Sequence, residues 1–548
     1  MSKYLDKGVL GAVWLSLIVL VLVPLVFIVP AGLGLTDGNF LAPVVKFLND
    51  ERLPAVLRNT FLLATCVTIV SCILGVLFAL AVERTSMRFA WLAHQMIMVP
   101  ILVSPLVGAV AWVTLARPST GFINVAWRTL TGSRDPLFSI YSFAGIALVI
   151  SLHVAPYVYI NVRNALQNID GAMEEAAAIL GSHTLTTWFR ITIPLAMPAI
   201  LSSALLVFVL TLETFSVVGL LGGPAGFVTL PFSIYLAINL PPGDWNYAAF
   251  EGLLLITITG LLMILYWKVI GASGQYAAIG GKGFRLVSKV GGKVQGMLVV
   301  VVWSYAVIAV VLPVAALLLQ SFLGFTTSRF DNMIFTLANW QRLLDAPAFR
   351  LAFANTMIVG AVAATIAVVI GLFVSHFSIF ERMRSLEWLA GLPLAYPGIV
   401  LGMAFIFTYN GTFIYGTLAI LILAYVTQFL PFTTRALSAP VMQLDKGMDE
   451  AGKILGAYTM RRVMRITAPI VRSAVFSAWL IAFTRGIREL NVSIFLYTPA
   501  TIVMPVLIWN YMEQGTFSQA AALSLLQLFA MLFLVAIAER LGRRFESV

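Results

Sequence analysis

Charged residues are scarce in this sequence. Asp, Glu, Lys and Arg together make up 10% of its 548 residues, whereas soluble domains carry about 25%. Hydrophobic residues make up 60%, and the mean hydropathy is +0.97. These values exclude an ordinary soluble protein. Apolar runs of about 20 residues can cross a hydrocarbon core of about 30 Å with every backbone polar group bonded inside the helix. The sequence therefore predicts an all-α polytopic membrane protein.

Cysteine and histidine are also rare. The two cysteines, Cys66 and Cys72, lie in one apolar run, which excludes a disulfide framework or a thiolate metal site. His153 and His376 occur singly in or near other apolar runs. We expect both histidines to be buried and hydrogen-bonded rather than to bind a metal.

No complete nucleotide-binding motif occurs in the sequence. Lys282 follows two glycines, but Gly283 stands where a phosphate loop requires Ser or Thr. We therefore expect no catalytic residue, no metal ligand and no bound cofactor in this chain. If ATP drives the protein, a separate chain must bind ATP and Mg²⁺ and hydrolyse the nucleotide.

Twelve apolar runs predict about twelve transmembrane helices. We place them at 9–31, 59–82, 89–115, 138–162, 193–220, 247–270, 294–320, 353–379, 386–408, 412–434, 470–498 and 516–538. The third and ninth contain two prolines each, Pro100 with Pro105 and Pro393 with Pro397. Proline kinks or breaks a helix, so these two spans are expected to be interrupted.

One polar segment occurs twice between the apolar runs. The first copy, 170–194, reads DGAMEEAAAILGSHTLTTWFRITIP, and the second, 445–469, reads DKGMDEAGKILGAYTMRRVMRITAP. They align at a constant shift of 275 residues, about half of the chain. The identical pairs include Glu175 with Glu450, Ala176 with Ala451, Ile179 with Ile454, Leu180 with Leu455, Gly181 with Gly456 and Thr192 with Thr467. The protein is therefore predicted to consist of two related halves.

Six spans form each predicted half. Because six is an even number, both halves enter the membrane from the same side, as parallel repeats. We place the first half at 1–270 and the second at 294–548. The Gly- and Lys-rich segment 271–293 has too few apolar residues to pack as a domain, and we expect it to be a flexible cytoplasmic tether.

The similarity extends beyond the polar segment. Asn59-Thr60 matches Asn355-Thr356, Gly75 matches Gly371, and Trp91 matches Trp388 at a shift of 297 residues. The first half therefore holds 22 extra residues, at about 116–137. They form either an added amphipathic loop on the outer face or a docking surface for a partner.

Lysine and arginine predict the orientation in the membrane. With the N-terminus inside, the inner segments carry 23 of these residues and the outer segments carry nine. The positive-inside rule then places both termini and both polar segments in the cytoplasm. The net charge of +11 is thus explained by topology, and nucleic-acid binding is not needed to account for it.

Each polar segment is expected to form a short helix, a turn and a second short helix. Residues 172–180, AMEEAAAIL, are strong helix formers, and Asp170 is a suitable N-terminal cap. Gly181 can end the helix in a left-handed conformation, and Pro194 suits the first turn of the next span. The alternative is an interfacial helix that only rests on lipid.

This segment resembles the EAA loop of ABC-importer permeases. That pattern is Glu-Ala-Ala, three residues, Gly, nine residues and Ile-x-Leu-Pro. The residues that fill it here are Glu175, Ala176, Ala177, Gly181, Ile191 and Pro194 in the first copy, with Ile193 in place of Leu, and Glu450, Ala451, Gly456, Ile466 and Pro469 in the second copy. The second copy departs from the pattern at Gly452 and Ala468.

The resemblance implies a coupling role. In ABC importers this loop is a coupling helix that sits in a groove of a cytoplasmic ATPase subunit. By that analogy Glu175 and Glu450 contact the ATPase, Ala176 and Ala451 permit close approach, and Gly181 and Gly456 set the bend. Ala177 and Gly452 complete the set of coupling residues. The implied protein is a fused permease of the bacterial inner membrane. It would work with two ATPase copies and a periplasmic binding protein and would itself be no enzyme.

Charged residues inside predicted spans are costly and mark a pathway or a paired structural site, and four of them bear on the pathway. Arg485, Arg488 and Glu489 lie in the eleventh span, and Glu213 lies in the fifth. We predict that they line a central pathway and form a gate. The alternative is a structural brace, because Arg485 and Glu489 are four residues apart and could form an ion pair within one helix.

The cargo is less well determined than the family. The run REL-x-x-S-x-x-L at 488–496 resembles the ferric-iron and thiamine permease group, so ferric iron is the first prediction. Thiamine, aminoethylphosphonate and polyamines stay open. A secondary transporter with twelve spans in parallel halves is the chief rival class, and a membrane anchor without transport is a third.

Overall fold

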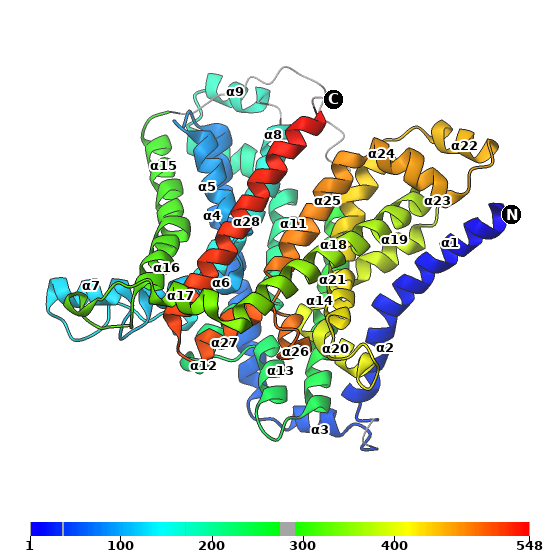
Figure 1. Cartoon of the computed structure of the whole chain (residues 1–548). Coiled ribbons are helices and arrows are strands. Elements are labelled where there is room, and N and C mark those ends of the chain that lie inside the picture. The colour runs from blue at the N-terminus through cyan, green and yellow to red at the C-terminus, as the bar shows by residue number, and fades with distance from the viewer. Residues whose placement is uncertain (1, 36–37, 170, 274–290, 547–548) are drawn as a thin grey trace.

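A computed structural model describes residues 2–35, 38–169, 171–273 and 291–546 (Figure 1). The described residues form helices of widely varying length and contain no β-strand, although Leu323 and Phe335 form an isolated bridge. The all-α prediction is confirmed. Most of the predicted tether, at 274–290, lies outside the described residues.

The first half contains these elements: α1 Ser2–Leu17, η1 Ile18–Leu22, α2 Val23–Gly32, α3 Ala42–Leu48, α4 Leu53–Arg84, α5 Ala90–Leu102, α6 Pro105–Ala116, α7 Phe122–Thr131, α8 Phe143–Asn168, α9 Ala172–Ile179, α10 Thr184–Thr187, η2 Trp188–Thr192, α11 Ile193–Leu212, α12 Ser216–Ala225, α13 Leu230–Asn239 and α14 Trp245–Ser273.

The second half contains these elements: α15 Lys293–Ala306, η4 Val307–Val311, α16 Leu312–Phe322, η5 Phe330–Asn332, α17 Ala338–Asp345, α18 Pro347–Phe380, α19 Arg384–Gly391, η6 Leu392–Ala395, α20 Gly398–Tyr409, α21 Leu418–Met442, α22 Lys446–Ile454, α23 Thr459–Arg462, η7 Val463–Thr467, α24 Ala468–Ile470, α25 Arg472–Ile487, α26 Ser493–Leu496, α27 Met504–Glu513 and α28 Phe517–Glu546.

The number of spans agrees with the prediction. In the described part of the chain nine continuous helical segments are long and apolar enough to cross a membrane, and four bent helix pairs raise the number to at most 13. The predicted third and ninth spans are two of the bent pairs, with angles of 101° and 107°. Their breaks coincide with prolines, because Pro105 begins α6 and Pro397 precedes α20. The expected interruption is confirmed.

Several predicted spans have wrong boundaries, and the fifth, tenth and eleventh are examples. The fifth and eleventh were placed at 193–220 and 470–498, but α11 ends at Leu212 and α25 ends at Ile487. After α25 the Glu489 carboxylate accepts a hydrogen bond from the Val492 N–H at 3.1 Å, just before α26 begins. Such local side-chain bonds compete with helix continuation. The tenth span begins at Leu418 rather than 412, because Gly411 and Gly416 adopt positive φ in a turn.

The sequence matches between the halves mark equivalent contacts. The hydroxyl of Thr60 accepts a hydrogen bond from the Leu230 N–H, and that of Thr356 accepts one from the Met504 N–H. The preceding asparagines donate to backbone carbonyls at the same places, Asn59 to Val228 and Asn355 to Ala500 and Ile502. In each half, therefore, one Asn-Thr pair fixes the start of the short helix α13 or α27.

Small residues let the long helices cross closely, as in other membrane bundles. A Cβ atom on Gly75 of α4 would lie 2.5 Å from the Val158 Cβ of α8. A Cβ atom on Gly371 of α18 would lie 3.0 Å from the Thr433 hydroxyl of α21. These two glycines occupy matching places in the two halves.

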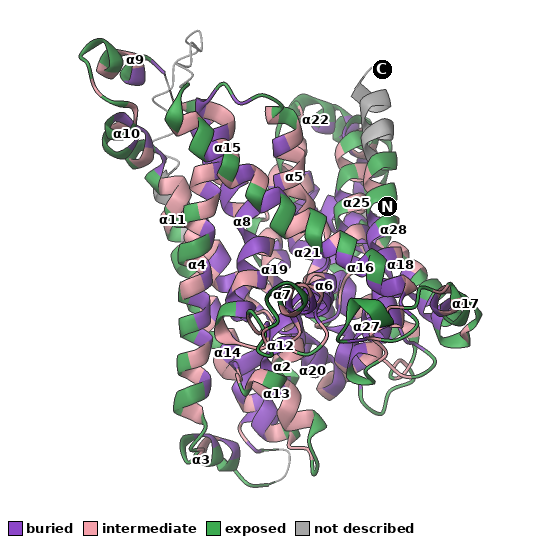
Figure 2. Ribbon diagram, turned by 90° about the vertical axis from the view of Figure 1, so that its left-hand side faces the viewer, coloured by how far each residue is buried: buried purple, intermediate pink, exposed green. Residues whose placement is uncertain are grey.

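The halves are interlocked by their first helices. Helix α2 packs along α20 of the second half, and α16 packs against α6 of the first (Figure 1). The Thr427 hydroxyl donates to the Leu20 carbonyl at 3.1 Å, and the Tyr305 hydroxyl donates to the Leu152 carbonyl at 2.7 Å. Buried side chains fill the interior of the bundle along these contacts (Figure 2).

Two ends of the bundle can be distinguished. Helices α9 and α22 lie at one end, together with the C-terminal part of α28, whereas α3 and α13 lie at the other (Figure 1). Asp6 of α1 accepts a hydrogen bond from the Thr459 N–H beside α22, so the N-terminal helix also reaches the first end. We call these the loop end and the distal end.

The extra segment at 116–137 contains helix α7, which projects from the side of the bundle (Figure 1). The buried Asn124 amide donates to the carbonyls of Ala116, Arg117 and Phe138 and fixes the base of this segment. An added amphipathic segment is therefore present. Its use as a docking surface stays a prediction.

Candidate functional site

Helices α9 and α22, here called the repeat-loop helices, end as predicted. Gly181 and Gly456 have φ of +78° and +77°. The Ser182 N–H donates to the Ala177 carbonyl at 2.9 Å, and the Ala457 N–H donates to the Gly452 carbonyl at 3.0 Å. Each glycine thus ends its helix in the left-handed conformation that glycine adopts without strain. In the second copy Asp445 caps the helix by accepting from the Gly447 N–H, whereas Asp170 lies outside the described residues.

A buried acid anchors the first repeat-loop helix to the bundle. The Arg84 Nε lies 3.0 Å from the Glu174 Oε1, and the Thr192 hydroxyl donates to the same oxygen at 2.8 Å. Arg84 also donates to the Leu166 carbonyl at the end of α8. The two ionic side chains are 1% and 6% exposed. Helix α9 is therefore tied to α4, α8 and η2 through one ion pair.

The matching acid of the second helix, Asp449, belongs to a larger network. It pairs with the buried Arg462, and the His376 Nε2 lies 3.6 Å from its Oδ1. Arg462 further donates to the Thr459 hydroxyl at 2.9 Å and to Glu381 at 3.4 Å. Lys453 lies 2.7 Å from Glu381. The second helix is therefore held by several charges, and the loss of one leaves others in place.

The electrostatics favour ionised acids in this network. Partial burial of Glu381 opposes ionisation, but the hydrogen bonds and charges of Lys453 and Arg462 outweigh it and hold the pKa of Glu381 below its ordinary value. A lowered carboxyl pKa means that this contribution to stability is present at neutral pH and is lost as the pH falls through that pKa.

The departure of the second copy from the sequence pattern has a packing reason. A Cβ atom on Gly452 would lie 3.3 Å from both Cγ and Cδ of Arg462 and 3.1 Å from the Ile466 side chain. The first copy has Ala177 at the matching position and the short Thr187 where Arg462 stands in the second. Gly452 therefore leaves room for the arginine that anchors α22.

Apart from Gly452, which is buried against Arg462 and Ile466, the predicted contact residues lie on the outward sides of the repeat-loop helices. Glu450, Ala176 and Ala451 are exposed, and Glu175 and Ala177 are partly exposed. Within the described residues neither Glu175 nor Glu450 forms an ion pair. Both carboxylates are therefore available to another molecule.

Four large apolar side chains form the tips of the repeat-loop helices. Ile179, Leu180, Ile454 and Leu455 are 86–87% exposed, among the most exposed apolar side chains of the chain. They occupy identical positions in the two copies. Exposed apolar groups at a fixed place on a membrane protein's polar surface mark an interaction site. We call them the tip pairs.

The structure brings the four intramembrane charges together. Glu213, Arg485, Arg488 and Glu489 line one cavity of about 160 Å³ between the two halves. Polar side chains from both halves complete the lining, namely Ser104, His153, Tyr157, Thr214, Gln428 and Asn491. Glu213 follows α11 in the same way as Arg488 follows α25, since each is the residue that ends its helix.

Arg488 connects the halves at this cavity. Its guanidinium donates to the Ile101 carbonyl, which lies four residues before Pro105. Because proline has no N–H, that carbonyl lacks its usual helical donor. The arginine of the second half therefore satisfies a carbonyl that the break between α5 and α6 leaves open in the first half.

The predicted alternative of an ion pair within one helix is wrong. Helix α25 ends before Glu489, and the described residues contain no ion pair between Arg485 and Glu489 within 4.0 Å. Arg485 instead stacks on the Phe432 ring at 3.6 Å. The Glu213 Oε1 is buried without a hydrogen-bond partner among the described residues. The charges thus surround the cavity rather than neutralising one another in pairs.

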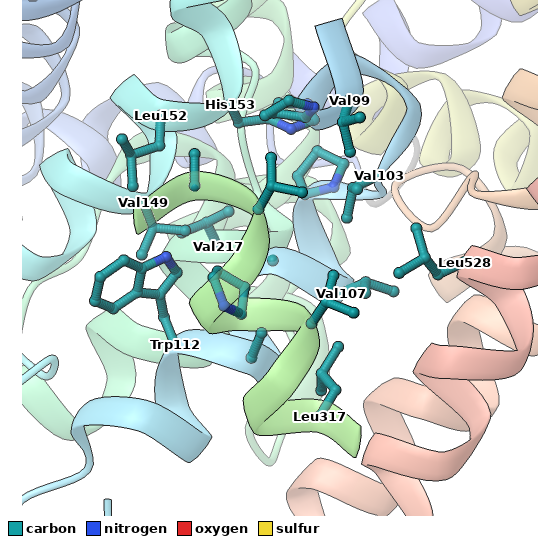
Figure 3. Close-up of a pocket in the computed structure, with 18 residues that line it drawn as sticks. Val99, Val103, Val107, Trp112, Val149, Leu152, His153, Val217, Leu317 and Leu528 are labelled. Atoms are coloured by element: carbon teal, nitrogen blue, oxygen red, sulfur yellow. The ribbon is translucent and has the colours of Figure 1, made fainter. Parts of the chain in front are cut away.

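A second, apolar cavity of about 50 Å³ lies beside the polar one (Figure 3). Valines, leucines, prolines and Trp112 line it, and His153 borders both cavities. An apolar cavity of this kind stays dry, so it offers no route for a charged solute.

His376 is buried and contacts the Thr467 hydroxyl through Nδ1 at 3.3 Å, as expected for a structural histidine. The described residues contain no group of three or more metal-ligating side chains that could hold a metal.

Sequence reasoning missed the anchoring residues, chiefly Arg84, Glu174, Asp449 and Arg462. A signal was present, because both copies have an acid immediately before Glu175 and Glu450, and the threonine at 192 and 467 is identical. The basic partners gave no such signal, since they come from unrelated positions in the two halves.

Comparison with known proteins gives a consistent result. The family described as the inner membrane component of binding-protein-dependent transport systems matches residues 13–272 and 367–547. The ferric transport system permease protein FbpB of Actinobacillus pleuropneumoniae is 30% identical over 97% of this chain and 78% of its own length. The Fe(3+)-transport system permease protein FbpB 2 of Haemophilus influenzae is 23% identical over 94% of this chain and 95% of its own. The spermidine/putrescine permease PotB of Escherichia coli is 25% identical over 46% of this chain and 93% of its own.

Proposed function

Since the chain belongs to the family of inner membrane components of binding-protein-dependent transport systems, we propose that it carries ferric iron. It is the permease of an ABC importer, a multi-pass protein of the inner membrane that receives its solute from a substrate-binding protein. The ferric assignment rests on relatives of ferric transport systems that align along nearly the whole chain. The polyamine relative aligns with less than half of it.

The proposal includes two copies of a separate ATPase at the loop end. The observation that carries it is the duplicated helix, anchored by a buried acid and bearing an exposed apolar tip. Each tip pair would enter a groove of one ATPase subunit, with Glu175 or Glu450 beside it. Both termini and both repeat-loop helices would then face the cytoplasm. ATP and Mg²⁺ would bind to the ATPase, whose closure would draw the two helices together and switch the access of the central cavity.

Uptake measurements test the cargo and the energy source together. In cells that carry the transport system, we expect uptake of radioactive ferric iron to stop when ATP is depleted and to continue when the proton gradient is collapsed. Competition by unlabelled spermidine or thiamine should leave the uptake unchanged. Uptake that follows the proton gradient would instead indicate the secondary transporter class. Labelled spermidine or thiamine carried in place of iron would replace the ferric assignment.

We further propose that the charges around the central cavity form a gate. Arg488 contacts the α5–α6 break of the opposite half, and Glu489 and Glu213 line the same cavity. Glu213 occupies the position in the first half that corresponds to Arg488 in the second. A change in the distance between the halves must therefore alter this cluster. Charged groups here are costly unless the pathway uses them or partners satisfy them.

Glu489→Gln separates a gate from a structural brace. The glutamine oxygen can still accept from the Val492 N–H, so the variant removes the charge and keeps the fold. We expect normal abundance, with iron uptake per ATP hydrolysed reduced at least tenfold. Glu387→Gln is the matched control, since this carboxylate accepts a hydrogen bond from Ser378 far from the cavity. Reduced abundance with unchanged uptake per molecule would identify a brace.

A further inference from the structure

The distal end holds a second polar cavity, which belongs to the first half alone. It has a volume of about 660 Å³ and lies among the segment after α3, the start of α4, α13 and the start of α14. Four acids and two bases line it, namely Asp50, Glu51, Asp244 and Glu251 with Lys46 and Arg52. In the second half, the corresponding part of α28 at 517–528 contains no acid. The acidic cavity therefore breaks the symmetry of the two halves.

One acid of this cavity is buried and lacks a donor. Glu251 is 1% exposed. Its Oε1 accepts from the Ser233 hydroxyl at 2.7 Å, whereas its Oε2 has no hydrogen-bond partner among the described residues. The single hydroxyl proton of nearby Tyr247 is donated to Asp50 at 2.7 Å. Buried carboxylate oxygens are normally satisfied, so the cavity presents an acceptor that requires a donor.

The acids at the mouth of the cavity are held in the ionised form. Burial opposes ionisation of Asp50, but hydrogen bonds from the Arg52 N–H and the Tyr247 hydroxyl, with nearby positive charge, hold its pKa below the ordinary value. Burial likewise opposes ionisation of Asp244, and Lys46 lowers its pKa. With two bases against four acids, the lining has an excess of acidic groups.

The cavity already binds one amine of the chain itself. The Lys46 Nζ lies 2.5 Å from the Asp244 carboxylate and 5.1 Å from the centre of the Tyr247 ring. A carboxylate beside an aromatic face is suited to a protonated amine, which gains both an ion pair and a cation–π contact. The same tyrosine reaches Asp50 on its other side through its hydroxyl.

A metal ion fits this cavity poorly. The described residues contain no set of three or more carboxylate, imidazole or thiolate groups that converge on one point. The acids are spread around a space that greatly exceeds a single ion. An extended molecule with several N–H donors matches the volume of about 660 Å³ better than a single ion does.

We propose that the distal cavity binds a small organic cation with protonated amines, one of which donates to Glu251 and Asp50. This site is separate from the central cavity and does not depend on the identity of the transported solute. A bound amine would supply the donor that Glu251 lacks and would link α4, α13 and α14 at the end of the bundle that faces the binding protein in the proposed orientation.

Titration calorimetry on the full chain in lipid nanodiscs tests the site, with 1,4-diaminobutane as the probe. We expect saturable binding to the unmodified protein and none of uncharged 1,4-butanediol. Glu251→Gln and Asp50→Asn should each weaken binding at least tenfold. Asp345→Asn is the matched control, because Asp345 is an exposed acid of the second half, 3.9 Å from Arg350. The Asp345→Asn variant should bind the diamine as the unmodified protein does.

Two outcomes would overturn the proposal. The first is the absence of saturable diamine binding to the unmodified protein. The second is equal weakening in Glu251→Gln, Asp50→Asn and Asp345→Asn, which would indicate non-specific charge attraction. Thermal unfolding of each variant verifies that it is folded, and Asp50→Asn alone keeps the test decisive if Glu251→Gln does not fold.

Discussion

Substitution of both tip pairs by aspartate, at Ile179, Leu180, Ile454 and Leu455, is expected to abolish ATP-driven uptake and leave the chain folded in the membrane. These side chains are 86–87% exposed, so their replacement removes no packing within the chain. In a groove of the ATPase, however, each would be buried. Full burial of a large apolar side chain contributes about 1.5–3 kcal/mol to the free energy of association. Burial of four aspartate charges in apolar grooves would cost more free energy than association gains.

The measurement is iron uptake in vesicles that contain the permease, the ATPase and the binding protein. Phe413→Asp is the matched control, because Phe413 is 91% exposed and lies in the turn between α20 and α21 rather than on a repeat-loop helix. We expect the control to transport at the normal rate. Normal transport by the fourfold tip variant would show that the tips do not carry the coupling, and the alternative of a helix that only rests on lipid would then be favoured.

Loss of the first anchor is expected to have the second large effect. Glu174→Ala leaves Arg84 buried without its acid, and such an unpaired buried charge costs about 3–5 kcal/mol. This loss of free energy weakens the contact that holds α9 against α4 and η2. We expect amide hydrogen exchange in 172–180 to accelerate about 100-fold, with uptake reduced to a small fraction.

The second anchor should be less sensitive. After Asp449→Ala, Arg462 still bonds to Glu381 and Thr459, so exchange in α22 should rise much less than exchange in α9. Glu175→Ala provides the matched control in the isolated chain, because this neighbouring acid forms no ion pair among the described residues. Unchanged protection of α9 in Glu174→Ala would contradict the anchoring role. So would equal exchange in the Glu174→Ala and Glu175→Ala variants.

Much of this architecture could be predicted from the sequence because its causes are local. Apolar runs long enough to cross the membrane identify the spans, and the prolines at 105 and 397 predict the breaks beside them. Gly181 and Gly456 end the repeat-loop helices because each follows a run of helix-forming residues. Such features depend on residues within one or two helical turns.

The parts that could not be predicted depend on distant residues. Arg84 lies 90 positions from Glu174, and no periodicity in the sequence pairs them. The end of α25 is set by the hydrogen bond from Val492 to Glu489 and by the contact of Arg488 with Ile101, 387 positions away. A sequence pattern cannot distinguish that arrangement from a longer helix. The distal cavity was missed for the same reason, since Asp50 and Tyr247 meet only in the folded chain.

In the proposed complex each repeat-loop helix binds one ATPase subunit. The most direct test is the mass of the detergent-purified complex, determined for the unmodified permease and for variants with one or both tip pairs replaced by aspartate. We expect two ATPase copies on the unmodified chain, one when either tip pair is replaced, and none when both are replaced. Retention of two copies by the fourfold variant would contradict this expectation.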